Sequence, residues 1–135
     1  MGAWSTGSFD NDDAADWIAT LMEHGDMGFV RETIADLLAV DGYIEASHAA
    51  CALAAIETLA AALGRPTPVA QANENLAHWL ARSHPIADAT MTADALVAID
   101  RIMGQQSELC ELWKESASFD EWQSRVATLR GRLQT

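Results

Sequence analysis

The chain has 135 residues, of which 50% are hydrophobic and 21% charged, and its formal net charge is −12. These values are typical of one folded globular domain with a single core, and they exclude a disordered or fibrous chain. The acidic charge also argues against binding to nucleic acid or to an anionic membrane, because both are negatively charged themselves. No apolar run is long enough to span a membrane.

The negative charge is concentrated in the first third of the chain. Residues 1–45 contain ten acidic residues and one basic residue, Arg31, which is a net charge of −9. The C-terminal part is less negative, since it carries Lys114, Arg125, Arg130 and Arg132. Such a distribution favours solubility, and it also suits a basic protein partner.

The two cysteines, Cys51 and Cys110, do not form a Cys-x-x-Cys pair, so no zinc or redox motif is present. No secretory signal is recognisable before the domain. We therefore expect a cytoplasmic protein in which both thiols are reduced and no disulfide joins them.

The apolar residues recur at helical spacing almost throughout, and no segment alternates as a β-strand would, which predicts an all-α fold. A first helix begins after Asp10 or Asn11, either of which can cap it, and ends at Gly25. A second helix begins after Asp26 and ends at Asp41-Gly42. Their apolar faces consist of Ala14, Trp17, Ile18, Leu21 and Met22, and of Phe29, Val30, Thr33, Ile34, Leu37 and Leu38.

The third predicted helix, residues 47–63, has almost no polar face, because alanine fills much of it. A helix that is apolar all round is a buried helix, so we expect this one at the centre of the domain. Gly64 and Pro66 end it.

Glu57 is an exception in this apolar helix, since a carboxylate there must be exposed, hydrogen-bonded or protonated. One interpretation is a catalytic or ligand-binding acid in a cleft. The interpretation that we favour is structural. In it, Glu57 accepts hydrogen bonds from backbone amides or an indole N–H of residues 2–7, and it fastens that segment to the core.

The second half of the chain predicts further short helices. Thr67-Pro68 begins a fourth helix that ends before Pro85, and a fifth runs over residues 92–103. Ser107 begins a short sixth helix, and Ser118 with Glu121 forms a capping box for the last one. Their apolar residues are Val69, Ala72, Leu76, Trp79 and Leu80; Leu96, Ile99 and Met103; Leu109, Leu112 and Trp113; and Phe119, Trp122, Val126, Leu129 and Leu133.

Together these elements predict a single-domain bundle of six or seven short helices over residues 1–135, with an irregular N-terminal segment, residues 1–10, packed on it. Four of the five tryptophans lie on apolar helix faces and are expected in the core. Trp4 lies outside any predicted helix, and we expect it to fill a gap between helices.

Four aspartates, Asp10, Asp12, Asp13 and Asp16, gather at the start of the first helix. Carboxylates in such number can hold a hard cation such as Mg²⁺ or Ca²⁺, although the glycine and glutamate of an EF-hand loop are missing. The interpretation that we favour is helix capping and a favourable interaction with the helix dipole. A metal-dependent enzyme or metal-binding protein built on this cluster is our alternative hypothesis for the function.

No recognised catalytic or cofactor motif accompanies these carboxylates. We expect His24, His48 and His84 in caps or loops and His78 on the surface, and we expect no catalytic residue and no cofactor. The leading hypothesis is a non-enzymatic acidic module that binds a basic protein partner. An immunity-like or antitoxin-like protein is one concrete form of that role.

The most specific motif of the chain is Gly2-Ala3-Trp4, Gly7 and Phe9-Asp10-Asn11-Asp12, followed by Ala15-Asp16-Trp17. Together with Ser107-Glu108-Leu109, Leu112-Trp113, Phe119 and Trp122, it resembles the bacterial domain of unknown function 4259 family. The resemblance spans nearly the whole chain and implies a small cytoplasmic protein, but no activity and no catalytic residue. The residues that we expect to be structurally important are Gly2, Ala3, Trp4, Gly7, Phe9, Asp10, Asn11, Asp12, Trp17 and Glu57.

Overall fold

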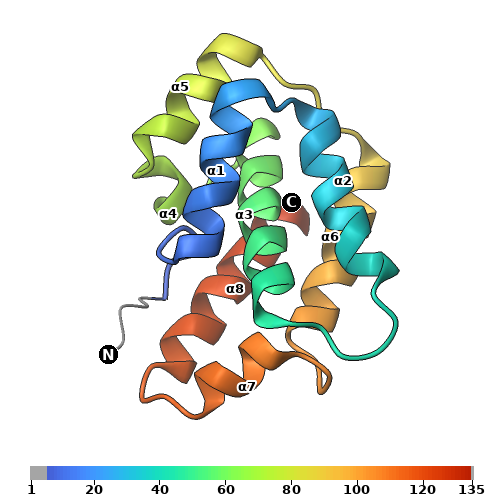
Figure 1. Cartoon of the computed structure of the whole chain (residues 1–135). Helices are drawn as coiled ribbons and strands as arrows, with labels where there is room; N and C mark the ends of the chain where they lie inside the picture. Colours follow the sequence, from blue (N-terminus) through green and yellow to red (C-terminus); the bar gives the residue numbers. More distant parts are fainter. Residues whose placement is uncertain (1–5, 135) are drawn as a thin grey trace.

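Eight helices and no β-strand make up residues 6–134, the part of the chain that the computed structural model describes (Figure 1). The helices are α1 (Asp12–His24), α2 (Met27–Ala39), α3 (Ala46–Ala62), α4 (Pro68–Gln71), α5 (Glu74–Ser83), α6 (Ala89–Ile102), α7 (Glu108–Lys114) and α8 (Phe119–Gln134). The all-α prediction is confirmed, whereas the predicted number of six or seven helices is wrong.

Helix α3 lies in the middle of the bundle and contacts each of the other seven helices (Figure 1). From Ala49 to Ala61 every side chain except that of Cys51 is buried, because alanine lets the neighbouring helices approach closely. The helix ends as predicted at Gly64, whose φ of +82° is a left-handed conformation that glycine adopts at low cost. The backbone N–H groups of Gly64 and Arg65 donate to the carbonyls of Ala61 (2.9 Å) and Ala60 (3.0 Å).

The caps of α1 and α2 are those that the sequence predicts. Asn11 Oδ1 accepts from the backbone N–H of Ala14 (2.9 Å), and Asp26 Oδ1 accepts from that of Phe29 (3.1 Å). Trp17 of α1 stacks on Phe29 of α2 with ring centroids 5.0 Å apart, and its indole N–H donates to Thr33 Oγ1 (2.8 Å). These contacts join the first two helices on one side of α3.

The predicted fourth helix is in fact two helices, because Asn73 interrupts it. Its side-chain Oδ1 accepts from the backbone N–H of Leu76 (3.0 Å), so Asn73 caps a new helix, α5, instead of continuing α4. Helix α5 ends at His84, which has a φ of +45° and precedes Pro85. Helix α6 begins three residues earlier than predicted, since Asp88 Oδ1 caps it through the N–H of Met91.

The start of α8 differs from the predicted capping box. The backbone N–H of Ser118 donates to Ser116 Oγ (3.1 Å), and the carboxylate of Glu121 accepts instead from the Thr6 hydroxyl. Ser107 caps α7 as predicted, through the N–H of Cys110 (3.3 Å). Leu112, which we placed on the apolar face of this helix, is 49% exposed.

Two loops pair at the end of the bundle near α7. Ile44, between α2 and α3, donates its N–H to the carbonyl of Gln106 (2.9 Å) and accepts from the N–H of Glu108 (2.9 Å). Glu108 Oε1 then accepts from the N–H of Ala46 (2.7 Å) and caps α3 from a distant part of the chain. None of the helices within residues 6–134 has both the length and the apolar character to cross a membrane.

Candidate functional site

The four aspartates of the candidate metal site are not gathered around a common point. Asp12 and Asp13 lie in the first turn of α1, and the side chains of Asp10, Asp12 and Asp16 are exposed. No group of three or more His, Cys, Asp or Glu side chains within residues 6–134 is placed to hold a metal ion. The arrangement agrees with capping and helix-dipole stabilisation, and it lends no support to the metal hypothesis.

The outward faces of α1 and α2 carry a set of carboxylates that we call the acidic surface. Its members, all exposed, are Asp12, Asp16 and Glu23 of α1 and Glu32 and Asp36 of α2. The three ion pairs between described residues use other acids, namely Asp88, Glu121 and Asp100. The acidic surface is therefore not neutralised by an ion pair with any other residue of the range 6–134.

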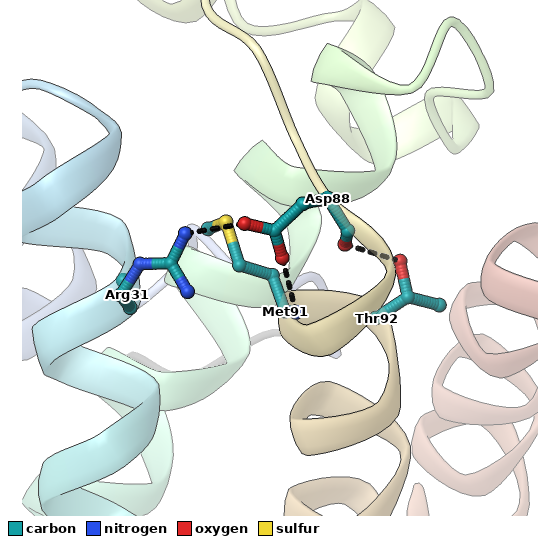
Figure 2. Close-up of polar contacts among 4 residues, drawn as sticks. All are labelled: Arg31, Asp88, Met91 and Thr92. Carbon is teal, nitrogen blue, oxygen red and sulfur yellow. Dashed lines mark hydrogen bonds and ion pairs between the residues drawn. The ribbon is translucent and has the colours of Figure 1, made fainter.

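Arg31, the only basic residue of α2, is engaged elsewhere. Figure 2 shows its guanidinium reaching Asp88 Oδ2, at 2.6 Å, where α6 begins. The other oxygen, Asp88 Oδ1, caps α6 by accepting from the N–H of Met91 (2.9 Å). The hydrogen bond from Arg31 is the largest cause that lowers the pKa of Asp88, so the carboxylate stays ionised and available for this ion pair.

Glu57 lies on the buried helix α3 and is the second candidate functional group. Only 2% of its surface is exposed. Its Oε1 accepts from the hydroxyl of Thr67 (2.7 Å), and its Oε2 accepts from the hydroxyl of Ser8 (2.7 Å). Thr67 Oγ1 also accepts from the N–H of Ala70 (3.2 Å), so Thr67 links the Glu57 carboxylate to the first turn of α4.

A second set of contacts ties the same N-terminal segment to α8. The Arg125 guanidinium donates from Nε to Thr6 Oγ1 (2.7 Å), and the Thr6 hydroxyl in turn donates to Glu121 Oε2. Arg125 Nε also lies 3.6 Å from Glu121 Oε2. Two hydrogen-bonded sets thus lie beside each other, since Glu57 of the first and Arg125 of the second line the same cavity. We call them together the Glu57 network: Ser8, Glu57 and Thr67 in one set, and Thr6, Glu121 and Arg125 in the other.

Burial raises the pKa of Glu57 above its ordinary value, because the apolar surroundings disfavour the charged form. The hydrogen bonds from Thr67 and Ser8 and the positive charge of Arg125 act in the opposite direction.

A small cavity opens beside this carboxylate. It has a volume of about 90 Å³ and is lined by Glu57, Thr67, Pro68, Val69, Arg125 and Thr128. The walls therefore combine one buried carboxylate and one guanidinium with the apolar surfaces of a proline, a valine and a threonine.

The described residues cover only part of our interpretation of Glu57. We expected backbone amides or an indole N–H of residues 2–7 as donors; among residues 6–134 the donors to Glu57 are the hydroxyls of Ser8 and Thr67. The general idea that Glu57 fastens the N-terminal segment agrees with the bond to Ser8. Gly2, Ala3 and Trp4 lie outside the described residues.

Gly7 and Phe9 take part in the same turn region. The carbonyl of Gly7 accepts from the N–H of Asp10 (3.1 Å), and a Cβ on Gly7 would collide with the Asp10 carboxylate. Phe9 packs partly buried against the core. The contacting atoms belong to the end of an exposed side chain that can move, so this contact alone does not require glycine at position 7.

The cysteines and histidines are distributed over several helices. Both cysteines are free thiols, as expected, and burial raises the pKa of Cys51, which makes it a weaker nucleophile at neutral pH. His78 is exposed, as predicted, and His84 is the C-cap residue of α5, which agrees with its predicted place in a cap or loop. His48 lies in the first turn of α3 rather than in a cap or loop.

A larger and more open cavity of about 320 Å³ lies between the two paired loops, lined by Gly42, Ile44, Arg101, Gly104, Gln105 and Gln106. The guanidinium of Arg101 donates from both terminal nitrogens to four backbone carbonyls, those of Leu37, Leu38, Val40 and Gly42. Arg101 thus caps the C-terminal end of α2, and its role is structural.

The fold and the Glu57 network define an all-helical protein whose central helix buries a hydrogen-bonded carboxylate next to a small cavity. The chain belongs to the family described as Domain of unknown function (DUF4259), whose model matches residues 2–125. The family resemblance that the sequence motif predicts is therefore confirmed. No curated protein and no solved structure matches the chain.

Proposed function

We propose that this protein is a non-enzymatic interaction module whose acidic surface on α1 and α2 binds a basic protein partner. The observation that carries the proposal is the exposure of five carboxylates on two adjacent helices, together with the engagement of Arg31 by Asp88. Immunity-like or antitoxin-like inhibition of a basic protein is one concrete form of this function. The proposal includes a cytoplasmic location, which the two free thiols support.

The physical argument is one of fixed charge. Because α1 and α2 bury their apolar faces against α3, their carboxylates are held on rigid helices instead of flexible loops. A preorganised set of like charges attracts an oppositely charged surface from a distance and loses little entropy on binding. The attraction should weaken as salt screens it, with a Debye length of about 8 Å at physiological ionic strength.

The test compares two variants that remove the same number of charges. The first carries Asp16→Asn, Glu32→Gln and Asp36→Asn on the acidic surface. The second, the matched control, carries three neutral substitutions at exposed acids outside α1 and α2, namely Glu74→Gln, Glu115→Gln and Asp120→Asn. Both raise the net charge equally, so a difference between them reports position and not total charge. Circular dichroism confirms that each variant is folded.

Each protein is immobilised and used to capture partners from the source cell at increasing salt. We expect a basic protein that is retained by the wild type and the control variant, is lost from the acidic-surface variant, and elutes as the salt concentration rises. Capture of no partner at any ionic strength, or equal capture by both variants, would refute the proposal.

A further inference from the structure

The larger cavity, between the loop that joins α2 to α3 and the loop that joins α6 to α7, has a formally positive wall. Among the residues that line it, Arg101 has the one ionisable side chain, and no carboxylate is part of the wall. The neighbouring acids in the sequence, Asp41 and Glu108, do not line it, and Glu108 Oε1 accepts from the N–H of Ala46. The wall therefore favours an anion, although the chain as a whole has a net charge of −12.

The guanidinium of Arg101 is held in place at this wall. Its terminal nitrogens cap α2 through bonds of 2.8 to 3.2 Å to four backbone carbonyls, those of residues 37, 38, 40 and 42. The same bonds leave its Nε–H without an acceptor among residues 6–134. Because the side chain is already ordered, it loses little further entropy when it binds an anion.

Backbone donors border the same cavity. The N–H groups of Gly42, Gln105 and Gln106 donate to no acceptor within residues 6–134. Backbone N–H groups of turns and loops are common ligands of anions in proteins. The side chains of Gln105 and Gln106 are exposed, and each carboxamide adds two N–H donors and one carbonyl acceptor.

The size and the chemistry of the cavity select among possible ligands. Its volume of about 320 Å³ lies at the lower end of the range of about 300–1,000 Å³ that is typical of small-molecule sites. One guanidinium matches the charge of one carboxylate, and the two carboxamides suit a further polar group such as an amide or a hydroxyl. A cation fits less well, because no carboxylate lines the wall.

We infer that this cavity binds the carboxylate of a small organic acid, which lies against Arg101 and the backbone N–H groups of Gln105 and Gln106. The side-chain carboxamides of the two glutamines hold a second polar group of the ligand. The carboxylate belongs either to a free acid or to the C-terminus of a peptide, which present the same chemistry. No residue of this site belongs to the acidic surface of α1 and α2, so the inference stands or falls independently of the proposed function.

The test is an NMR titration of sodium N-acetylglycinate into the isotope-labelled full chain at neutral pH and constant ionic strength. We expect the amide signals of Gly42, Gln105 and Gln106 to shift in a saturable way. Gln106→Glu keeps the shape of the side chain but places a negative charge in the wall, so it should weaken binding about tenfold or more. Gln123→Glu makes the same change at an exposed glutamine of α8 and should bind like the wild type.

Ligand controls make the result decisive. N-acetylglycinamide has nearly the same shape without the charge, and choline has the opposite charge, so neither should saturate the site. A peptide of several residues that ends in a free carboxylate distinguishes the two sources, since it binds only if the entrance admits a chain. If Gln106→Glu does not fold, Gln105→Glu, which is also exposed, takes its place. Shifts indistinguishable from those with sodium chloride, equal binding of N-acetylglycinamide, or equal binding to the folded glutamate variant would overturn the inference.

Discussion

The hydrogen bond between Thr67 and Glu57 can be tested with a substitution that keeps the shape of the side chain. Thr67→Val replaces a hydroxyl by a methyl group at a residue that is only 2% exposed. The substitution removes the 2.7 Å bond to the Glu57 carboxylate and the 3.2 Å cap on the N–H of Ala70. It thereby leaves a buried carboxylate oxygen with one donor fewer.

Thr58→Val is the matched control for this substitution. Thr58 follows Glu57 in α3, is fully buried, and like Thr67 donates one hydrogen bond, but its acceptor is the carbonyl of Ala54 (2.9 Å). That carbonyl accepts the ordinary helix hydrogen bond as well, so it is not left unsatisfied. The two variants share the chemical change and the burial and differ in the acceptor.

The expected free energies follow from these contacts. A hydrogen bond to a charged group contributes about 1.5–3 kcal/mol, and a threonine cap about 1 kcal/mol. Thr67→Val should therefore lower the free energy of unfolding by about 2.5–4 kcal/mol. Thr58→Val should lower it by about 1 kcal/mol or less.

The assay is urea unfolding at neutral pH, followed by tryptophan fluorescence and by circular dichroism. Coincident transitions and equal slopes against urea would show that both variants unfold in the same two-state manner as the wild type. If the two free energies agree within about 0.5 kcal/mol, the Thr67–Glu57 bond does not stabilise the fold and our account of the Glu57 network is wrong.

Three further predictions test other parts of the structure. Burial raises the pKa of Glu57 above its ordinary 4.5, so its contribution to stability is greatest below that pH and is lost as the pH rises through the folded-state pKa. In urea titrations Glu57→Gln should therefore gain stability relative to the wild type as the pH rises above 4.5; a relative loss of stability would contradict the raised pKa. Gly64→Ala, at a φ of +82°, should destabilise the protein by about 1–2 kcal/mol, whereas Gly131→Ala inside α8 should stabilise it by up to about 1 kcal/mol. Thermal melts measure both changes, and changes of equal sign would be inconsistent with the left-handed conformation of Gly64. Mg²⁺ or Ca²⁺ should not raise the melting temperature of metal-stripped protein, because Asp12 and its neighbours do not converge; a saturable rise that Asp12→Asn abolishes would restore the metal hypothesis.

The helix boundaries show which features could be predicted locally. The caps at Asn11 and Asp26 and the stop at Gly64 were predictable because each depends on residues within one turn of the chain. The buried alanine-rich helix was predictable because its apolar residues are contiguous in the sequence. The break at Asn73 was missed even though it is also a local cap. An asparagine inside an apolar pattern can lie in a helix or begin a new one, and packing on the neighbouring helices selects between these states.

The chemical environment of Glu57 shows the limit of the same reasoning. A carboxylate in an apolar helix has to be satisfied somewhere, and the sequence alone establishes that requirement. The identity of the donors is a different matter, since Ser8 lies 49 residues away in the chain and Arg125 belongs to the last helix. Hydroxyls and guanidinium groups are common along the chain, and no local pattern singles out the few that meet at one point.

The acidic surface, too, is predictable from the sequence only in part. The excess of ten acids over one base in residues 1–45 is a property of composition, and so are the helical period and the turn residues that define an all-α chain. The packing of α2 beside α6 decides which carboxylates of α2 face outward. It also brings Arg31 to Asp88, with which it forms an ion pair. Local propensity acts over a few residues, whereas a binding surface or a cavity exists only where segments distant in sequence are brought together by burial of a common core.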